Sequence, residues 1–139
     1  MKSYSIEPAD ASGVALLNHL QGLILPDDRP ADHRIGLWWV VEEDGQPAGF
    51  CGVHPSVQWG DTLYLCRAGV REEFRGLGLQ RKMIQLRERA ARRLGFRWLI
   101  SDTTDNPASA NSLIGCGFKT FTPSRPWGWK HTIYWRKEL

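Results

Sequence analysis

The stretch REEFRGLGLQRKMI, residues 71–84, leads from two closely spaced glycines directly into a segment with helical periodicity. From Gly76 to Leu94, apolar residues recur every three or four positions, which predicts an amphipathic helix. Its buried stripe comprises Leu79, Met83, Leu86, Ala90 and Leu94. The opposite face of this helix is expected to meet solvent and is basic. Its one acidic residue is Glu88, and its basic residues are Arg81, Lys82, Arg87, Arg89, Arg92 and Arg93. Gly95 is predicted to end the helix at the C′ position.

The two glycines have the chemistry of an anion-binding loop. At the start of a helix, several backbone N–H groups lack a partner within the helix, and the helix dipole adds partial positive charge. Gly76 and Gly78 carry no Cβ atom, so a phosphate can approach the backbone closely. Arg75 and Arg81 add charge at either end. These residues fit a diphosphate, but taken alone they fit a simple tight turn equally well.

Two other phosphate loops are excluded at this position. A dinucleotide-binding fingerprint needs a third glycine at the close contact between helix and strand, where this chain has Gln80 and Arg81. A Walker loop needs Gly-Lys-Ser or Gly-Lys-Thr, and neither occurs here. The class of phosphate site must therefore be found from the rest of the chain.

The remaining segments predict a mixed-sheet α/β (α+β) fold with the element order β-α-β-β-β-α-β-α-β-β. Strands are predicted over residues 2–6, 37–43, 47–57, 63–70, 96–103, 118–121 and 130–137. Helices are predicted over 11–24 and 76–94, and a short third helix runs from Pro107 to a stop at Gly117. Asp44-Gly45 indicates an antiparallel hairpin. The strand–helix–strand unit over 63–103 favours parallel pairing with a right-handed crossover.

Composition indicates one soluble globular domain over residues 1–139, with 42% hydrophobic and 24% charged residues. The net charge of +3 is compatible with an anionic ligand and does not require nucleic acid. No apolar run approaches the roughly 20 residues that cross a bilayer, and the N-terminus lacks the apolar core of a signal peptide. Cys51, Cys66 and Cys116 have no metal-binding or disulfide spacing. We therefore expect a cytoplasmic protein with reduced thiols and no metal site.

Two segments of the chain resemble the GNAT N-acetyltransferase superfamily. Residues 70–79, VREEFRGLGL, resemble its acyl-CoA loop, which reads Arg/Gln-x-x-Gly-x-Gly/Ala after a strand; Arg75 and Gly78 match, and Gln80 departs. In the second segment, Asn106, Ser109, Gly117 and Phe118 fall on the family's positions. Leu113 stands where the family has a Tyr. The predicted element order also agrees, so the resemblance covers nearly the whole chain.

The resemblance implies a GNAT-like mixed sheet, splayed between the strands 63–70 and 96–103, with helices on both faces. It implies acetyl-CoA as the co-substrate, with its pantetheine arm in the splayed opening. The backbone around Gly69, Val70 and Arg71 would meet this arm, and Asn106 and Ser109 would contact it from the other side. The pyrophosphate would be held by Arg75, Gly76, Leu77, Gly78, Leu79, Gln80 and Arg81. From the residues alone, Asn106 can equally be a plain helix N-cap before Pro107.

The implied reaction is transfer of an acetyl group from acetyl-CoA to a primary amine of an unidentified acceptor. A base must take a proton from the ammonium, and an acid can protonate the departing thiolate. Because Leu113 cannot serve as that acid, the candidates for these two roles are Asp102, Tyr134 and Cys66. Each has a structural alternative: Asp102 can cap a turn, Tyr134 can be an ordinary core residue, and Cys66 can be a buried core thiol.

Other functions remain open at this point. Leu113 motivates a GNAT-like domain that binds acyl-CoA without turnover. The basic face of residues 81–93 suggests a nucleic-acid-binding protein as a further alternative. A solvated helix face also explains these arginines, and no nucleic-acid-binding motif is present. The tryptophans near the C-terminus, Trp127, Trp129 and Trp135, can wall a substrate pocket or fill the core. The expected partners are acetyl-CoA and an amine, without a membrane, and the oligomeric state is open, a homodimer included.

Overall fold

The computed structural model describes all residues, 1–139, and the chain divides into two compact units. The first unit contains residues 1–54 and 66–83, and the second contains residues 55–65 and 84–139. Hydrogen bonding gives one sheet order, β1-β2-β3-β4-β5-β7-β6. β4 (Thr62–Val70) and α2 (Leu79–Arg93) each begin in one unit and continue in the other.

The first unit is built on an antiparallel sheet. Its remaining elements are β1 (Lys2–Ile6), α1 (Ala11–Ile24), β2 (Leu37–Glu43), β3 (Gln46–Pro55) and the short 3₁₀ turn η1 (Glu72–Phe74). β1 pairs with β2 and β2 with β3, both antiparallel. Asp44 and Gly45 between β2 and β3 have φ values of 53° and 74°, as a type I′ turn requires. The predicted antiparallel hairpin is therefore confirmed.

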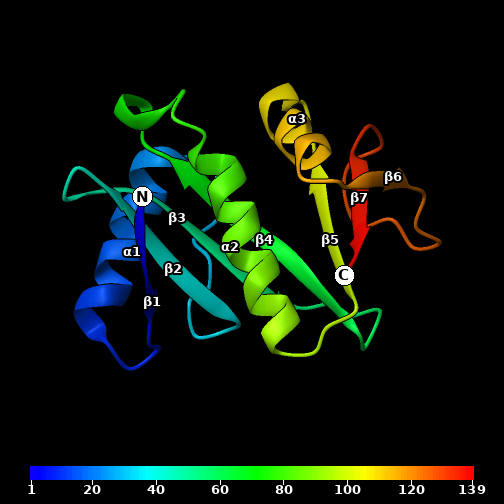
Figure 1. Cartoon of the computed structure of the whole chain (residues 1–139), viewed down its shortest axis with the longest axis horizontal. Helices are drawn as coiled ribbons and strands as arrows, with labels where there is room; N and C mark the ends of the chain where they lie inside the picture. Colours follow the sequence, from blue (N-terminus) through cyan, green and yellow to red (C-terminus); the bar gives the residue numbers. More distant parts are fainter. The chain divides into compact units, whose positions relative to one another are not determined.

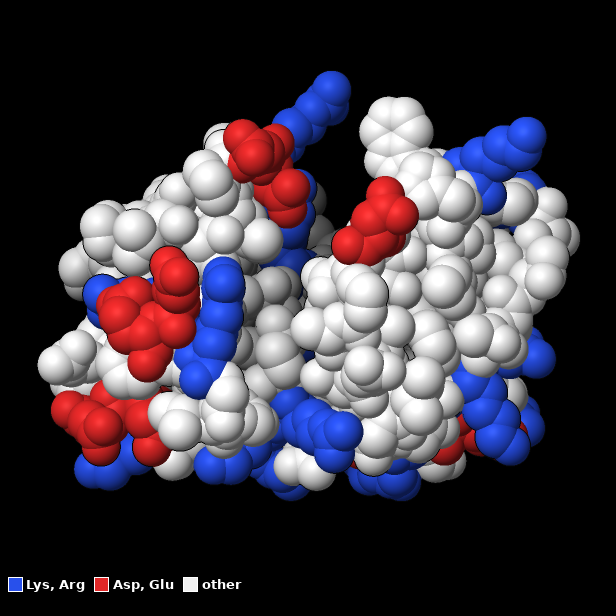
Figure 2. All heavy atoms as spheres, turned by 90° about the horizontal axis from the view of Figure 1, so that it is seen from above, with Lys and Arg blue, Asp and Glu red and all other residues white.

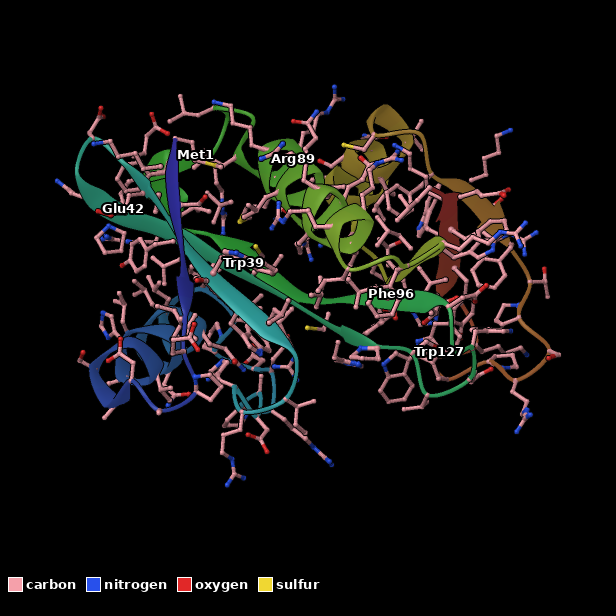
Figure 3. All side chains as sticks on the ribbon, turned by 60° about the horizontal axis from the view of Figure 1, so that its bottom comes forward. Met1, Trp39, Glu42, Arg89, Phe96 and Trp127 are labelled. Carbon is pink, nitrogen blue, oxygen red and sulfur yellow. The ribbon has the colours of Figure 1, made fainter.

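The core of the first unit lies between α1 and this sheet. α1 begins at Asp10, whose side chain accepts a hydrogen bond from the Gly13 N–H and caps the helix. The buried cluster comprises Ile6, Leu17, Leu20, Trp38, Val40 and Phe50. Figures 1 and 3 show α1 against one face of these strands and the start of α2 on the other face. The first turn of α2 is thereby held against the sheet, which positions the loop that precedes it.

The second unit combines parallel and antiparallel pairing. Its further elements are β5 (Trp98–Thr103), α3 (Pro107–Gly115), β6 (Lys119–Phe121) and β7 (Ile133–Glu138). The start of β4 pairs with β5 in parallel, and β7 pairs antiparallel with both β5 and β6. The β4–β5 pairing covers three residue pairs and ends at Tyr64 and Ile100, although both strands continue. The predicted order of strands and helices is confirmed, and η1 is the one addition to it.

The helix predicted over residues 76–94 is shorter than the periodicity indicated. Both Gly76 and Gly78 have positive φ, 83° and 76°, which an α-helix does not allow, so α2 begins at Leu79. At the other end, Phe96 N–H bonds Ala91 O and Gly95 N–H bonds Arg92 O. These two bonds and the φ of 82° at Gly95 form a Schellman motif, which confirms the predicted stop.

The burial of α2 corrects two further expectations. Leu94 lies beyond the last helical residue and is 57% exposed, so it is not part of the buried stripe. Arg87, predicted on the solvated face, is 3% exposed. Ile84, Arg87 and Ala91 are all buried at helical spacing, so α2 is covered over a wider arc than the apolar residues alone indicated. The basic face that meets solvent is correspondingly narrower.

Lys137 on β7 joins the helices of the second unit to its sheet. Its Nζ lies 2.7 Å from Glu88 Oε1 on α2 and donates a hydrogen bond of 2.8 Å to Cys116 O, just after α3. Side chains alternate along a strand, so Tyr134 and Arg136 point to the face opposite Lys137. That opposite face is covered by the chain that connects β6 and β7, and it carries the aromatic side chains described below.

His33, in the connection between α1 and β2, predicts a pH-dependent stability. Its ring is 5% exposed and stands edge-on to Trp38, and its Nε2 has no hydrogen-bond partner. Burial lowers the pKa of His33 from its usual 6.5; Asp32 opposes this change and Arg67 adds to it. The unfolded chain therefore binds a proton that the folded chain excludes.

We expect the free energy of unfolding to decrease as the pH falls below about 6.5, because protonation then favours the unfolded chain. His33→Phe keeps a ring against Trp38 and should remove the contribution of His33 to this slope. Urea unfolding of both proteins over the range from mildly acidic to neutral pH measures the difference. Equal slopes in the two proteins would assign the pH dependence to other groups.

Candidate active site

The glycine loop presents backbone donors at the start of α2. No hydrogen bond within the protein uses the N–H groups of Gly76, Leu77 or Gly78. The first helical bond of α2 runs from Lys82 N to Gly78 O, so the N–H of Leu79 precedes the helical ladder. A Cβ atom built on Gly76 or Gly78 would meet nothing within 4 Å, so the space beside both glycines is open. The loop therefore has the donors and the access that an anion site needs.

The chain before the loop is held by Arg71 and Phe74. The Arg71 N–H bonds Ala48 O at 2.7 Å, and its guanidinium donates to Pro47 O and lies 2.7 Å from Glu73 Oε2. The same guanidinium stacks over the ring of Phe74, which is buried. Because these groups of Arg71 are engaged within the protein, they position η1 rather than reach outward. The Arg71 carbonyl also accepts a hydrogen bond from Phe74 N–H, so both backbone polar groups that the resemblance placed against the pantetheine arm have partners within the protein.

The two predicted residues before Arg71 are buried. A Cβ atom on Gly69 would lie 2.6 Å from Ile24 Cγ2 on α1, so the absence of a side chain lets β4 and α1 approach closely. Val70 is buried in the same unit. On the other side of the loop, Leu79 is buried and anchors the first turn of α2, whereas Gln80 is half-buried and Arg75 and Arg81 are exposed. The structure thus brings residues 69–81 together in one segment of the first unit.

Asn106 and Ser109 lie in the second unit, at the start of α3. Asn106 Oδ1 accepts a hydrogen bond of 3.1 Å from Ser109 N–H, and Pro107 occupies the first turn. The N-cap interpretation of Asn106 is therefore confirmed. Its side-chain NH₂ is not used by this cap and remains a donor. Leu113 is buried in the same helix, in keeping with a packing residue.

Asp102 is the centre of a hydrogen-bonded cluster in the second unit. Its Oδ2 accepts hydrogen bonds from Tyr64 Oη at 2.5 Å and from Trp127 Nε1 at 2.8 Å. No hydrogen bond reaches Oδ1, and the side chain is partly exposed. The Asp102 side chain therefore does not cap a turn: two donors from distant residues hold its carboxylate in one orientation, and one oxygen stays open to a ligand.

Sequence reasoning missed Tyr64 and its place beside Asp102. Tyr64 stands in β4 two residues before Cys66, and its register partner in β5 is Ile100. In parallel strands, this register puts Tyr64 and Asp102 on the same face of the sheet. The only available signal was a tyrosine in the predicted strand 63–70, and alternation along the strand does not identify its partner in β5.

Tyr134 lies opposite Asp102 in the antiparallel pairing of β5 and β7. Its ring is buried and contacts Trp127, with ring centroids 4.6 Å apart. Its oxygen accepts a hydrogen bond of 2.8 Å from Gly128 N–H, and no hydrogen bond uses its own proton. The structure therefore brings two of the predicted candidates, Asp102 and Tyr134, onto neighbouring strands, and leaves Tyr134 with a proton to donate.

Cys66, the third candidate, belongs to the first unit. It is half-buried and packs against the core cluster that includes Trp38 and Phe50. This apolar contact favours a packing role for the thiol. Cys51 and Cys116 are buried, and none of the three cysteines forms a disulfide.

The surface carries both signs of charge. Figure 2 shows Lys and Arg interspersed with Asp and Glu over the face that it presents. On α2 itself, Arg92 forms an ion pair with Glu88, while Arg89 is exposed (Figure 3). No group of three or more His, Cys, Asp or Glu side chains is placed to hold a metal ion. None of the helices has the length and apolar character needed to span a membrane.

A mixed sheet flanked by helices, with a glycine loop leading into the N-terminus of α2, defines an α+β protein of the kind that binds anionic ligands at a helix start. A family model described as the acetyltransferase (GNAT) family matches residues 13–118. The chain therefore belongs to the GNAT acetyltransferase family, as the resemblance of the two sequence segments implied.

Solved structures share this fold at low sequence identity. A Bacillus subtilis acetyltransferase in complex with CoA is 14% identical, with a TM-score of 0.78 over 99% of this chain and 98% of that chain. A Salmonella typhimurium protein solved with its cofactor acetyl-CoA is 16% identical, with a TM-score of 0.73 over 100% and 94%. The ribosomal-protein-S18-alanine N-acetyltransferase from Escherichia coli is 15% identical, with a TM-score of 0.76 over 99% and 92%. No curated protein sequence matches the chain.

Proposed function

We propose that this protein is an N-acetyltransferase that moves the acetyl group of acetyl-CoA to a primary amine. The observation that carries the proposal is the set of unused N–H donors at Gly76, Leu77 and Gly78, directly before α2, in a chain of the GNAT family. Two proteins of the same fold hold CoA or acetyl-CoA, which supports the same co-substrate here. We further propose that residues 1–139 act as one catalytic domain, since the family match crosses both compact units.

Different residues would bind different parts of acetyl-CoA. The backbone N–H groups from Gly76 to Leu79 would bind the pyrophosphate, with Arg75 and Arg81 supplying charge. The backbone around Gly69 and Val70 would meet the pantetheine arm, as the family resemblance implies. The Asn106 amide, which keeps its NH₂ group, and Ser109 would bind the same arm.

The chemical step needs a proton acceptor and a proton donor. The neutral amine attacks the thioester carbonyl carbon, a C–N bond forms, and the C–S bond breaks to release CoA thiolate. We assign to Asp102, whose Oδ1 is open, the proton that the ammonium loses to become the neutral amine; the second proton leaves the nitrogen to solvent once the C–N bond has formed. We assign protonation of the thiolate to Tyr134, because its hydroxyl proton is uncommitted and Leu113 cannot provide one.

The proposal is tested by incubating the full chain with acetyl-CoA and a panel of primary amines while the released CoA thiol is measured. Amine-dependent thiol release, together with an acetylated product of the expected mass, supports an N-acetyltransferase. Tight acetyl-CoA binding without release from any amine, small peptide or lysine-containing protein supports the non-catalytic alternative. An absence of CoA binding would overturn the assignment of the loop.

The affinity for CoA is predicted to depend on Gln80, independently of any acceptor amine. Gln80 stands where the family has a third small residue, and its half-buried amide offers two N–H donors. We expect Gln80→Ala to weaken CoA binding about two- to tenfold, because one neutral hydrogen bond contributes roughly 0.5–1.5 kcal/mol. Calorimetric titration with CoA and with dephospho-CoA measures this change, and both ligands should lose the same factor because both contain the pyrophosphate. Unchanged affinities would place Gln80 away from the phosphates.

A further inference from the structure

We propose that the acceptor is a primary amine borne on an aromatic or other flat apolar body, and that it binds at Asp102 and the ring of Trp127. This inference rests on the proposed acetyl transfer and names the class of its second substrate. It follows from three features of the second unit: one open carboxylate oxygen on Asp102, a connected group of aromatic rings around Trp127, and the engagement of Arg136, the cation that contacts these rings.

The carboxylate provides the recognition of a positive charge. Asp102 Oδ2 is occupied by the Tyr64 hydroxyl and the Trp127 indole N–H, so the carboxylate does not rotate freely. Its Oδ1 has no hydrogen-bond partner, and the residue is partly exposed. An ammonium group is a donor with three N–H bonds and matches such an oxygen in charge and in hydrogen bonding. The oxygen would thus hold the amine that reacts.

The rings beside this oxygen provide the apolar contact. Trp127 lies at the centre of the group, with ring centroids 4.6 Å from Tyr134, 6.3 Å from Tyr64 and 6.4 Å from Trp59. Phe121 extends the group through Trp59 and Tyr134. Trp127 is 38% exposed, and Tyr64, Trp59 and Phe121 are half-buried. An aromatic body can stack on such faces, and an ammonium is attracted to them as well.

This face stays accessible because the helices of the unit lie elsewhere. Lys137, which contacts α2 and α3, points to the other face of β7 from Tyr134. Two connections contact the aromatic face: the one from β6 to β7, which carries Trp127 (Figure 3), and the one from β3 to β4, which carries Trp59. The part of the β6–β7 connection that follows Trp127 is held by two hydrogen bonds, from Gly128 N–H to Tyr134 Oη and from Trp129 N–H to Thr132 Oγ1.

Charge in the cluster disfavours acceptors with a carboxylate next to the amine. The cation that contacts these rings is Arg136, and its guanidinium is stacked on both Trp98 and Phe121, 5.5 Å and 5.0 Å from their centroids. The Arg136 guanidinium is therefore already engaged by two rings. An amino-acid carboxylate would be brought close to Asp102 without a dedicated partner, which is repulsive.

The test compares three amines on the full chain with saturating acetyl-CoA: 2-phenylethylamine, n-butylamine and L-phenylalanine. The first two differ by the ring, and the first and third by a carboxylate. We expect kcat/KM for 2-phenylethylamine to exceed that for each of the others by about tenfold, from ring stacking and from like-charge repulsion respectively. Saturation-transfer NMR with CoA in place of acetyl-CoA measures amine binding without turnover.

Two variants test whether Trp127 causes the preference for 2-phenylethylamine over n-butylamine. Trp127→Leu removes the central ring while keeping an apolar side chain, and it should abolish the preference for 2-phenylethylamine over n-butylamine. Trp129→Ala is the matched control, because Trp129 is 74% exposed, lies two residues away and has no ring contact in the cluster. It should keep the preference. Circular dichroism and an unchanged affinity for CoA verify that both variants are folded.

The possible outcomes separate the inference from the proposed function. Selective turnover that Trp127→Leu removes supports both. Turnover of all three amines at equal kcat/KM, or a preference for L-phenylalanine, overturns the aromatic amine site and leaves the acetyltransferase in place. Selective binding of 2-phenylethylamine without turnover supports the site and overturns the enzyme. Equal loss of selectivity in Trp129→Ala would overturn the role of Trp127.

Discussion

Replacing Gly78 by Val is expected to lower the affinity for CoA by roughly 100-fold or more, because the loss of two hydrogen bonds to a charged phosphate costs about 3 kcal/mol or more. Gly78 has a φ of 76°, in the left-handed region that a β-branched residue strongly disfavours. The space where its Cβ would stand is open, so a side chain there would occupy the approach of the phosphate rather than clash with the protein. Calorimetric titration with CoA measures the loss.

Backbone strain must be separated from blocked access in this experiment. Gly95 is the matched control, because its φ is 82°, its Cβ position is also open, and it lies at the other end of α2. Gly95→Val should therefore cost similar stability in urea unfolding while the affinity for CoA is unchanged. If Gly78→Val folds and binds CoA as the wild type does, the assignment of residues 75–81 to the pyrophosphate is wrong.

Tyr134→Phe is expected to lower kcat by about 100-fold, since a positioned general acid contributes roughly 10²–10⁴-fold. The substitution keeps the ring that packs on Trp127 and Phe121, and it removes only the hydroxyl. The affinity for acetyl-CoA and the KM for the amine should change little, because the proton is transferred when the C–S bond breaks. Steady-state kinetics with the best amine of the panel, and calorimetry with acetyl-CoA, measure the three quantities.

The same hydroxyl also accepts a hydrogen bond from Gly128 N–H, so a displaced connection between β6 and β7 is the competing explanation. Thr132→Val is the control for that effect. Thr132 Oγ1 accepts the hydrogen bond of Trp129 N–H and contacts Thr104 Oγ1, so its removal loosens the same connection and leaves Tyr134 intact. A comparable fall in kcat in Thr132→Val would show that Tyr134 acts by positioning the chain and not as an acid.

The features of this protein that depend on neighbouring residues could be predicted from the sequence. The hairpin at Asp44-Gly45 and the helix stops at Gly95 and Gly117 follow from glycine and aspartate conformations that are local to the turn. The N-cap at Asn106 likewise depends on residues within one helical turn. Because the GNAT motifs are short runs of this kind, the glycine loop and the start of α3 could be recognised, and the family with them.

The side chains that meet across the sheet and the helix faces that are covered depend on long-range packing, and they became known from the folded chain. Arg87 is buried together with Ile84 and Ala91, because packing around α2 covers more than its apolar stripe. Tyr64 and Trp127 meet Asp102 from positions 38 and 25 residues away in the sequence. Their meeting depends on the register of β4 with β5 and on the path of the chain before β7. These long-range pairings are set by the burial of whole faces, so no local pattern in the sequence could specify the cluster around Asp102.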